Sequence, residues 1–488
     1  MLKKIFYILI MMFLLVGVYS NVLATDTYTT TTTINGVTVN WQYELNDSNQ
    51  IENLKCINPS DLTGNLIIPS TLDDKTVIGL KNEAFKGAIN ITSLTIPSSI
   101  KTIGYKAFEG CSNLENVNLG QVEKLSFNVF SDCPKLTKIT IPKTLIDGPG
   151  DVNNGVFTGT TNLTSVTFED GSTVIAAGIL KDCTGITKVK IPNTVTKVGE
   201  RAFSNSGLTE ITLPNAIKTI EYKAFEGCSN LENVNLGQVE KLSFNVFSDC
   251  PKLTKITIPK TLIDGPGDVN NGVFTGTTNL TSVTFEDGST VIAAGILKDC
   301  TAITNVTIPS TVTKIGCRAF EKSGIKEIVF SNSLQEIEYY AFNDCSDLTK
   351  ITILDNCTKI GGFNIQPTQD TVFQNHNENL TIYCYEGTKI AEYAIANNIK
   401  YVYLTKNTDE TTDDNLKDDE ETKLNNSNIN NNSNNTNAET SNNKTDDTTA
   451  KLPIPQTGEK TAIFIVIAIV LISGVFSYFK FYKYKDIK

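Results

Sequence analysis

The chain has 488 residues, a formal net charge of −11 at neutral pH, one histidine and eleven cysteines. The acidic balance argues against a nucleic-acid-binding protein, which would present a basic face. The single histidine, His376, excludes a His-rich metal site and a nucleophile–histidine pair repeated along the chain. The odd number of cysteines excludes a framework in which every cysteine forms an intramolecular disulfide.

The N-terminal stretch has the three parts of a secretory signal peptide. Lys3 and Lys4 precede an apolar core from Ile5 to Val18, and Val22-Leu23-Ala24 is a small-residue cleavage site. The stretch therefore predicts cleavage after Ala24 and export of the remaining chain. The alternative is that residues 1–24 stay attached as an N-terminal membrane anchor.

Residues 25–60 precede the regular repeats and are expected to cap them as a hairpin. Thr29–Thr33 is interpreted as a flexible polar run. Asn35-Gly36 then predicts a turn, and apolar and polar residues alternate from Val37 to Tyr43, as in a strand with one buried face. We expect Trp41 in the core of this cap, with a ligand platform as the alternative. A cap is needed because an open first rung would leave core and strand edge in water.

From Leu62 to about Leu354 a frame of 22 to 27 residues recurs, with the form L-x-x-I-x-I-P-x-x-V-x-x-I-x-x-x-A-F-x-x-C. Periods of this size indicate a solenoid. Each copy predicts one short strand, ended in many copies by proline, and a second apolar run that crosses back. About fourteen such rungs follow one another. The block Tyr105–Thr184 recurs letter for letter at Tyr222–Thr301, 117 positions later, which we interpret as a recent in-frame duplication.

A phenylalanine recurs in the frame and predicts an aromatic ladder through the core. Its members are Phe85, Phe108, Phe130, Phe157, Phe203, Phe225, Phe247, Phe274, Phe320, Phe342 and Phe373, with Ile179-Leu180 and Ile296-Leu297 in two rungs. A small residue follows three positions later, and seven of the cysteines fall there. We expect these to be buried, inert thiols. The alternative is disulfides Cys111–Cys133 and Cys228–Cys250 between adjacent rungs.

The frame, with Ile-Pro after the strand and Ala-Phe-x-x-Cys before the next, resembles the BspA-like class of leucine-rich repeats over about residues 60–400. The resemblance implies a leucine-rich repeat solenoid of the α/β class, right-handed and capped at both ends. Its strands would be short and parallel, on the concave side, with irregular or short helical returns. Members of that family are often bacterial surface proteins that bind matrix proteins or host cells, so the resemblance implies such a ligand without specifying it.

Two rungs depart from the frame by inserting LIDGPGDVNNGVF, at Leu145–Phe157 and again at Leu262–Phe274. Gly-Pro-Gly and Asn-Asn-Gly predict a protruding, exposed loop. Asp151 and Asn153 are candidate ligand contacts in the first of these loops. Calcium binding through Asp147, Asp151 and the nearby asparagines is the alternative, although the spacing matches no defined calcium loop.

After Phe373 the frame ends in a predicted C-terminal cap. It consists of a strand from Leu380 to Tyr385, a helix from Lys389 to Ala396 and a strand from Tyr401 to Leu404, so that the solenoid with its cap occupies 61–404. His376 is expected on the surface. Residues 405–452 are rich in Asn, Thr and Asp with almost no apolar side chains, which predicts a disordered, acidic spacer.

Residues 453–488 resemble a cell-wall sorting signal. Ile454-Pro455-Gln456-Thr457-Gly458 is similar to the L-P-x-T-G motif, with Ile454 in place of leucine. Residues 461–479 are apolar and long enough to span a bilayer, and the lysines after them predict a cytoplasmic end. The resemblance implies that a sortase cuts between Thr457 and Gly458 and joins Thr457 to peptidoglycan. The alternative is a C-terminal membrane anchor; both place the solenoid outside the cell.

The favoured hypothesis is an adhesin of a Gram-positive-type bacterium, secreted and anchored to the wall, with sortase, peptidoglycan and a host or matrix macromolecule as partners. The alternative is a structural wall-coat or spacer protein without a specific ligand. No catalytic constellation is visible and no cofactor or metal is expected. The outward strand positions lack Trp, Tyr and Arg, so ligand contacts are assigned to Tyr105, Tyr222, Tyr339 and Tyr340 or to the inserted loops.

Overall fold

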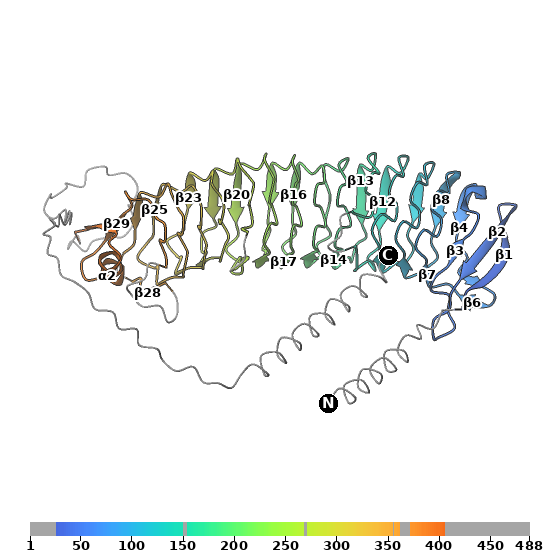
Figure 1. The fold of residues 1–488 in the computed structure, drawn as a ribbon, viewed down its shortest axis with the longest axis horizontal. Helices are drawn as coiled ribbons and strands as arrows, with labels where there is room; N and C mark the ends of the chain where they lie inside the picture. Colours follow the sequence, from blue (N-terminus) through green and yellow to red (C-terminus); the bar gives the residue numbers. More distant parts are fainter. Residues whose placement is uncertain (1–25, 150–153, 268–270, 355, 362–370, 406–488) are drawn as a thin grey trace, which may run out of the picture. The chain divides into compact units, whose positions relative to one another are not determined.

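The structure is a computed structural model that describes residues 26–149, 154–267, 271–354, 356–361 and 371–405. The chain divides into two units, Met1–Lys406 and Asn407–Lys488, of which the second lies outside the described residues. The signal peptide, the acidic spacer and the sorting motif all fall outside them as well. The described part is a parallel β-solenoid of about fourteen rungs with little helix (Figure 1), which confirms the fold class that the repeat frame predicted.

An antiparallel sheet of β1 (Tyr28–Ile34), β2 (Val37–Tyr43) and β3 (Lys55–Cys56) covers the first rung. β1 pairs with β2 along its whole length, so the expectation that Thr29–Thr33 is a flexible run is wrong. Threonine is a good strand former, and this run completes a hairpin around the Asn35-Gly36 turn. Trp41 is fully buried, and its ring meets Phe85 edge-on with centroids 5.9 Å apart. The core assignment of Trp41 is therefore confirmed.

Most rungs contribute strands to two columns, in which equivalent strands of successive rungs run parallel. In the first column Ile139 pairs with Val166 and Thr140 with Thr167. This column comprises β4 (Gly64–Ile67), β8 (Ile91–Thr95), β10 (Asn116–Asn118), β12 (Lys138–Ile141), β13 (Ser165–Phe168), β16 (Glu210–Thr212), β18 (Asn233–Asn235), β20 (Lys255–Ile258), β21 (Ser282–Phe285), β23 (Asn305–Thr307), β25 (Glu327–Val329) and β27 (Lys350–Thr352). It ends with β29 (Thr381–Cys384) and β30 (Lys400–Tyr403).

The second column is made of two-residue strands that cross back along the next side of each rung. They are β7 (Gly79–Leu80), β9 (Thr102–Ile103), β11 (Lys124–Leu125), β14 (Val174–Ile175), β15 (Lys197–Val198), β17 (Thr219–Ile220), β19 (Lys241–Leu242), β22 (Val291–Ile292), β24 (Lys314–Ile315), β26 (Glu336–Ile337) and β28 (Lys359–Ile360). Near the N-terminal cap, β5 (Thr71–Leu72) and β6 (Lys75–Thr76) form a small hairpin, and Pro59–Asp61 is a 3₁₀ turn.

Alternation of side chains gives the first column an apolar inner face and a polar outer face. In β12, Ile139 and Ile141 are buried, whereas Lys138 and Thr140 are exposed, as expected for a strand with period two. Pro142 follows this strand and ends its pairing, because proline has no N–H to donate. We call the outer surface of the first column the sheet face.

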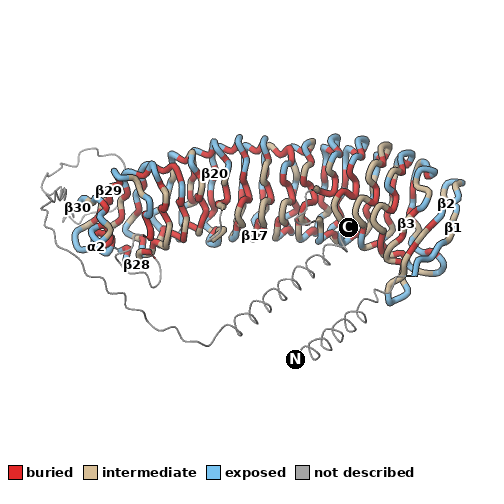
Figure 2. The backbone as a smooth tube through the Cα atoms, viewed as in Figure 1, coloured by how far each residue is buried: buried red, intermediate tan, exposed pale blue. Residues whose placement is uncertain are grey.

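The phenylalanines stack along the interior, where buried residues run through every rung (Figure 2). Neighbouring rings of the ladder have centroids between 5.1 and 5.8 Å apart and interplanar angles of at most 12°. Leu180 and Leu297 replace the ring in two rungs and are fully buried. The predicted ladder is confirmed, and its two interruptions lie where the sequence placed them.

The small residue after each ladder position is buried, and in most rungs it also satisfies a backbone carbonyl. The Sγ atoms of Cys133 and Cys250 lie 3.4 Å and 3.3 Å from the carbonyl oxygens of the ladder residues one rung back. Thr160 Oγ1 donates to the Phe130 carbonyl at 2.6 Å. The Phe108 and Phe225 carbonyls also accept from the backbone N–H groups of Cys111 and Cys228, so the thiols are second donors there, whereas the threonine hydroxyl is the donor that the structure shows for Phe130. All eleven cysteines are buried free thiols, so neither alternative disulfide is formed.

The C-terminal cap contains the helix that the sequence predicted, α2 (Lys389–Ala396). Thr388 caps it by accepting a hydrogen bond from the Ala391 backbone N–H. Tyr393 closes the aromatic ladder: its ring meets Phe373 at 6.3 Å, and its hydroxyl accepts hydrogen bonds from the backbone at 371 and 372. His376 is half-buried rather than freely exposed, with Nδ1 2.9 Å from the Phe373 carbonyl oxygen.

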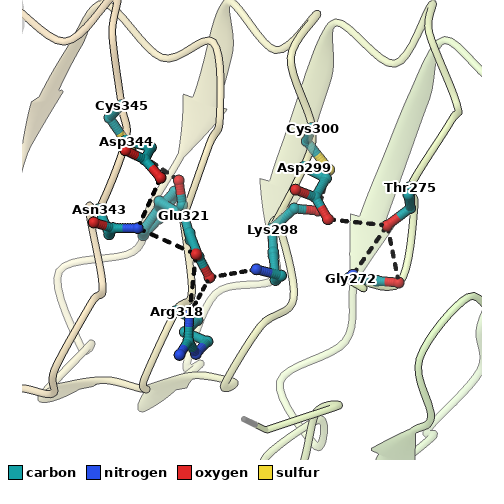
Figure 3. Close-up of polar contacts among 11 residues, drawn as sticks. Gly272, Thr275, Lys298, Asp299, Cys300, Arg318, Glu321, Asn343, Asp344 and Cys345 are labelled. Carbon is teal, nitrogen blue, oxygen red and sulfur yellow. Dashed lines mark hydrogen bonds and ion pairs between the residues drawn. The ribbon is translucent and has the colours of Figure 1, made fainter. Parts of the chain in front are cut away.

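A network of charged and polar side chains is buried between successive rungs (Figure 3). Glu321 pairs with Lys298 of the preceding rung, and both side chains are at most 5% exposed. Arg318 donates to both oxygens of Glu321 at 3.0 and 2.9 Å, and Asn343 Nδ2 donates to one of them at 3.2 Å. Lys181, the counterpart of Lys298 in the first duplicated block, lacks such a glutamate and pairs with Asp182 at 3.0 Å.

Candidate functional site

The tyrosines singled out in the sequence lie at one corner of the solenoid, where the chain leaves the second column and turns inward. We define the corner row as the residues three positions before each ladder position; it includes Tyr105, Tyr222 and Tyr339. The following residue adopts a left-handed conformation, with φ of 55° at Lys106 and 57° at Lys223. That turn directs the next two residues into the core and leaves the corner side chain half-buried at the surface.

Each duplicated block forms one corner pair, in which a tyrosine contacts a phenylalanine of the next rung. Tyr105 and Phe127 have ring centroids 4.2 Å apart at 36°, and Tyr222 and Phe244 repeat this at 4.3 Å and 37°. All four side chains are half-buried. The sequence analysis missed both phenylalanines, although their position 22 residues after each tyrosine is a detectable signal.

Cations adjoin both corner pairs. Lys106 Nζ lies 5.1 Å from the centre of the Tyr105 ring, and the Arg201 guanidinium lies 5.0 Å from that of Tyr222. Lys106 is itself 2.8 Å from Glu109. The hydrogen bond to Glu109 raises the pKa of Lys106. Burial would raise the pKa of Glu109, but Lys106 and Lys86 outweigh it and hold that pKa below its usual range.

Tyr339 and Tyr340 form a third corner cluster with a different geometry. The two rings are adjacent in the chain and meet edge-on, with centroids 5.6 Å apart at 82°. The Arg318 guanidinium lies 4.6 Å from the centre of the Tyr340 ring. The four predicted tyrosines therefore share one corner of the fold, but they belong to three separate clusters.

The other predicted contacts, Asp151 and Asn153, lie outside the described residues, but the two ends of their loop are described. Leu125 N donates to the Asp147 carbonyl at 3.2 Å, and Asn128 N donates to the Gly155 carbonyl at 2.8 Å. The two described ends of the loop thus bond to one rung, on either side of Phe127 along the chain.

The calcium alternative finds no support at the described end of the loop. Asp147 is held by Lys124 at 2.8 Å, and its copy Asp264 by Lys241 at 2.7 Å. Across the described ranges no group of three or more metal-binding side chains occurs. Residues 454–458, Thr457 included, and Ala24 fall outside the described residues. Within the part that the structure describes, no helix is long and apolar enough to cross a membrane.

The cysteine side chains are structural rather than reactive groups. Burial raises the pKa of Cys228 to about 11, opposed by hydrogen bonds from Ser206. Burial likewise raises the pKa of Cys345 to about 11. A thiol is nucleophilic as its thiolate, so the described cysteines are poorly suited to covalent chemistry.

The sequence matches the BspA type leucine-rich repeat region at residues 63–148, 150–265 and 267–391. A leucine-rich repeat protein from Bacteroides ovatus is 23% identical, with 79% of this chain and 100% of that chain covered and a TM-score of 0.46. A leucine-rich cell surface protein from Faecalibacterium prausnitzii is 22% identical, with 75% of this chain and 96% of that chain covered and a TM-score of 0.38. The pneumococcal vaccine antigen PcpA is 18% identical, with 77% of this chain and 99% of that chain covered and a TM-score of 0.40. These are likenesses of fold alone, and no curated protein matches the chain.

Proposed function

This chain belongs to the BspA-type leucine-rich repeat family, and on that premise we propose that it is a surface adhesin. The solenoid is exported, held outside the cell through its C-terminal end, and binds a host or matrix macromolecule at the corner row. The observation that carries this proposal is the corner pair, which occurs twice with the same geometry and with cations beside it. Tyrosine and arginine are among the side chains that dominate the binding energy of protein interfaces.

Duplication of the corner pair suits attachment to a large ligand. Two equal sites on one rigid array convert the second contact into an intramolecular event, which raises the overall affinity without any new contact. Selection for adhesion would favour such a gain, because a cell held at two points detaches more slowly than a cell held at one.

The anchoring half of the proposal rests on the sequence. Export requires cleavage after Ala24, and a sortase would then cut between Thr457 and Gly458. The carbonyl of Thr457 would pass from the Gly458 nitrogen, by way of the enzyme, to an amino group of the peptidoglycan. Ile454 stands where the motif has leucine, so we expect a sortase whose pocket accepts a β-branched side chain.

The test compares cells that display three forms of the full protein: wild type, one corner pair changed to alanine, and both pairs changed. We expect adhesion to matrix-coated surfaces to fall partly for Tyr222→Ala with Phe244→Ala, and to background when Tyr105→Ala and Phe127→Ala are added. Loss of an interface hot spot costs about 2 kcal/mol or more, roughly a thirtyfold drop in affinity.

Tyr403→Ala provides the matched control, because Tyr403 is an exposed aromatic residue of the C-terminal cap. Surface amount and protease resistance of every variant are measured in parallel, so that a folding defect is recognised. Adhesion retained by the quadruple variant at normal surface levels would refute a role for the corner row.

A structural wall-coat protein is the second candidate, and the sheet face favours it. That face is built from Thr, Asn, Ser, Lys and Glu side chains, which a soluble strand requires in any case. A panel of matrix proteins and host cells to which wild-type cells do not adhere would support this candidate against the adhesin.

A further inference from the structure

Two shallow grooves on the sheet face have related linings and volumes of about 280 and 420 Å³. Each crosses the first-column strands of four successive rungs. A third groove of about 400 Å³ is lined by residues between Lys188 and Pro214. The first groove is lined by Asn116, Asn118, Lys138, Thr140, Ser165 and Thr167. The second is lined by Asn233, Asn235, Lys255, Thr257, Ser282 and Thr284. Every residue of the second set lies 117 positions after its counterpart in the first.

The strand register gives both grooves the same arrangement of side chains. Lys138 lies opposite Ser165, and Lys255 lies opposite Ser282. Five rungs separate the two grooves, so at the usual spacing of parallel strands they are about 24 Å apart. The molecule therefore presents one polar site twice, on the same face and at a fixed spacing.

Three polar side chains in each groove have no partner within the described part of the chain: Asn116, Lys138 and Thr140, and their counterparts. Asn118 and Asn235 instead accept a hydrogen bond from a backbone N–H two residues on. Other lysines on the solenoid surface pair with a carboxylate of a neighbouring rung: Lys101 with Glu123 at 3.1 Å, and Lys188 with Glu210 at 2.8 Å. Lys138 and Lys255 form no ion pair within the described residues, although Glu210 and Glu232 also line the second groove, so each groove keeps an available ammonium group.

We propose that the two grooves together bind one linear polysaccharide whose sugar units carry carboxylate groups. The ammonium groups of Lys138 and Lys255 would each take a carboxylate, while Asn amides and Thr hydroxyls exchange hydrogen bonds with sugar hydroxyls. A protein partner fits less well, because Trp, Tyr and Arg are missing from both linings. A nucleic acid would need an array of cations rather than one per groove.

The two grooves differ at their edges. The strand at the N-terminal edge of each groove precedes the duplicated block, so it was not copied. Ser93 and Thr95 flank the first groove, where the second has Glu210 and Thr212. On the opposite side Thr167 bridges to Lys190, whereas Thr284 pairs with Thr307. The first groove therefore lies in the more positive surroundings, and we expect it to bind a carboxylated sugar more tightly than the second.

Calorimetry on the purified full-length protein tests the proposal with polygalacturonate as the probe. A short oligomer should bind at two sites per chain, whereas a chain long enough to span both grooves should bind one per protein with higher affinity. Intramolecular engagement of the second groove raises affinity by about 10²- to 10⁴-fold. Lys138→Met or Lys255→Met alone should remove that gain, and the double variant should abolish binding.

The matched control is Lys143→Met with Lys260→Met, two exposed lysines at the same 117-residue spacing beyond the ends of the strands. This control should bind polygalacturonate as the wild type does, and the methyl-esterified polymer should bind neither protein tightly. Three results would each overturn the proposal: no binding by the wild type, equal losses in the control pair, or equal binding of the esterified polymer. Binding of a matrix protein that depends on Lys138 and Lys255 would likewise replace the polysaccharide with a protein ligand.

This site is independent of the corner row and of wall anchoring. Substitutions at Tyr222 and Phe244 leave the groove residues in place, so an adhesin that fails the corner test can still bind polygalacturonate. Conversely, a negative result with polygalacturonate leaves the corner row untouched.

Discussion

Glu321→Gln is expected to be among the most destabilising single substitutions outside the ladder. The carboxylate of Glu321 is almost fully buried and compensates Lys298, whose side chain is 5% exposed. Glutamine keeps the volume but removes the charge, so the buried Lys298 ammonium loses the carboxylate with which it pairs. Breaking a buried pair in this way costs about 3–5 kcal/mol.

Hydrogen exchange gives the most direct readout, because a repeat array need not unfold in one step. The rungs around Glu321 lie outside the duplicated blocks, so their peptides are unique and can be assigned. We expect exchange of backbone amides near residues 318–345 to accelerate strongly in Glu321→Gln. Peptides around Phe85, many rungs away, should be unchanged and serve as the internal control.

The pH dependence provides a second check. Burial would raise the pKa of Glu321, but hydrogen bonds from Lys298 and Arg318 outweigh it and lower the pKa. A group whose pKa is lower in the folded state stabilises that state above its unfolded pKa, about 4.3 for glutamate. The difference between wild type and Glu321→Gln should therefore be largest near neutral pH and shrink as the pH falls below about 4.

A double variant separates the effect of the lost charge on stability from the effect of packing. Lys298→Met with Glu321→Leu removes both charges and should be near wild type or more stable, because a well-packed apolar pair often equals a buried ion pair. Arg318 then keeps its position over Tyr340. If Glu321→Gln lies within about 1 kcal/mol of wild type, the argument from an uncompensated buried charge is wrong.

Three further predictions concern the repeat frame. Lys322 has φ of 56°, so Lys322→Asn should stabilise the protein by about 1 kcal/mol in denaturant titrations, since asparagine tolerates this conformation better. Thr277→Val removes a hydroxyl that donates to the Phe247 carbonyl at 2.6 Å, and the orphaned carbonyl should lower stability by about 1–3 kcal/mol in the same assay. Cys228, whose pKa burial raises to about 11, should resist thiol reagents at pH 8 in the native protein and react once it is unfolded; rapid native labelling would contradict its burial.

The parts of the fold that repeat in the sequence were predictable from it. The period, the ladder around Phe108 and Phe225, and the helix Lys389–Ala396 all follow from local pattern, because each rung contacts only its neighbours. Thr29–Thr33 was misjudged for a physical reason. A threonine run has no apolar alternation, and its strand state depends on pairing with β2, which is tertiary information.

Only part of the candidate site could be predicted from the sequence. A tyrosine such as Tyr105 is conspicuous in the sequence, but its contact with Phe127 depends on which residues of adjacent rungs share a corner. The sequence predicts buried, inert thiols at the small position, whereas Thr160 shows that this position also supplies a hydrogen-bond donor. The twin grooves were missed because Thr, Asn and Lys on a strand are unremarkable until the register shows that Lys138 faces no carboxylate.

The central claim, that this solenoid works as a wall-anchored surface protein, is tested most directly by mass spectrometry of cell-wall fragments released by a muralytic enzyme. The account predicts a peptide of this chain that ends at Thr457 and is joined through an amide bond to a wall peptide. Recovery of the chain only with its C-terminus intact to Lys488, in the membrane fraction, would contradict it.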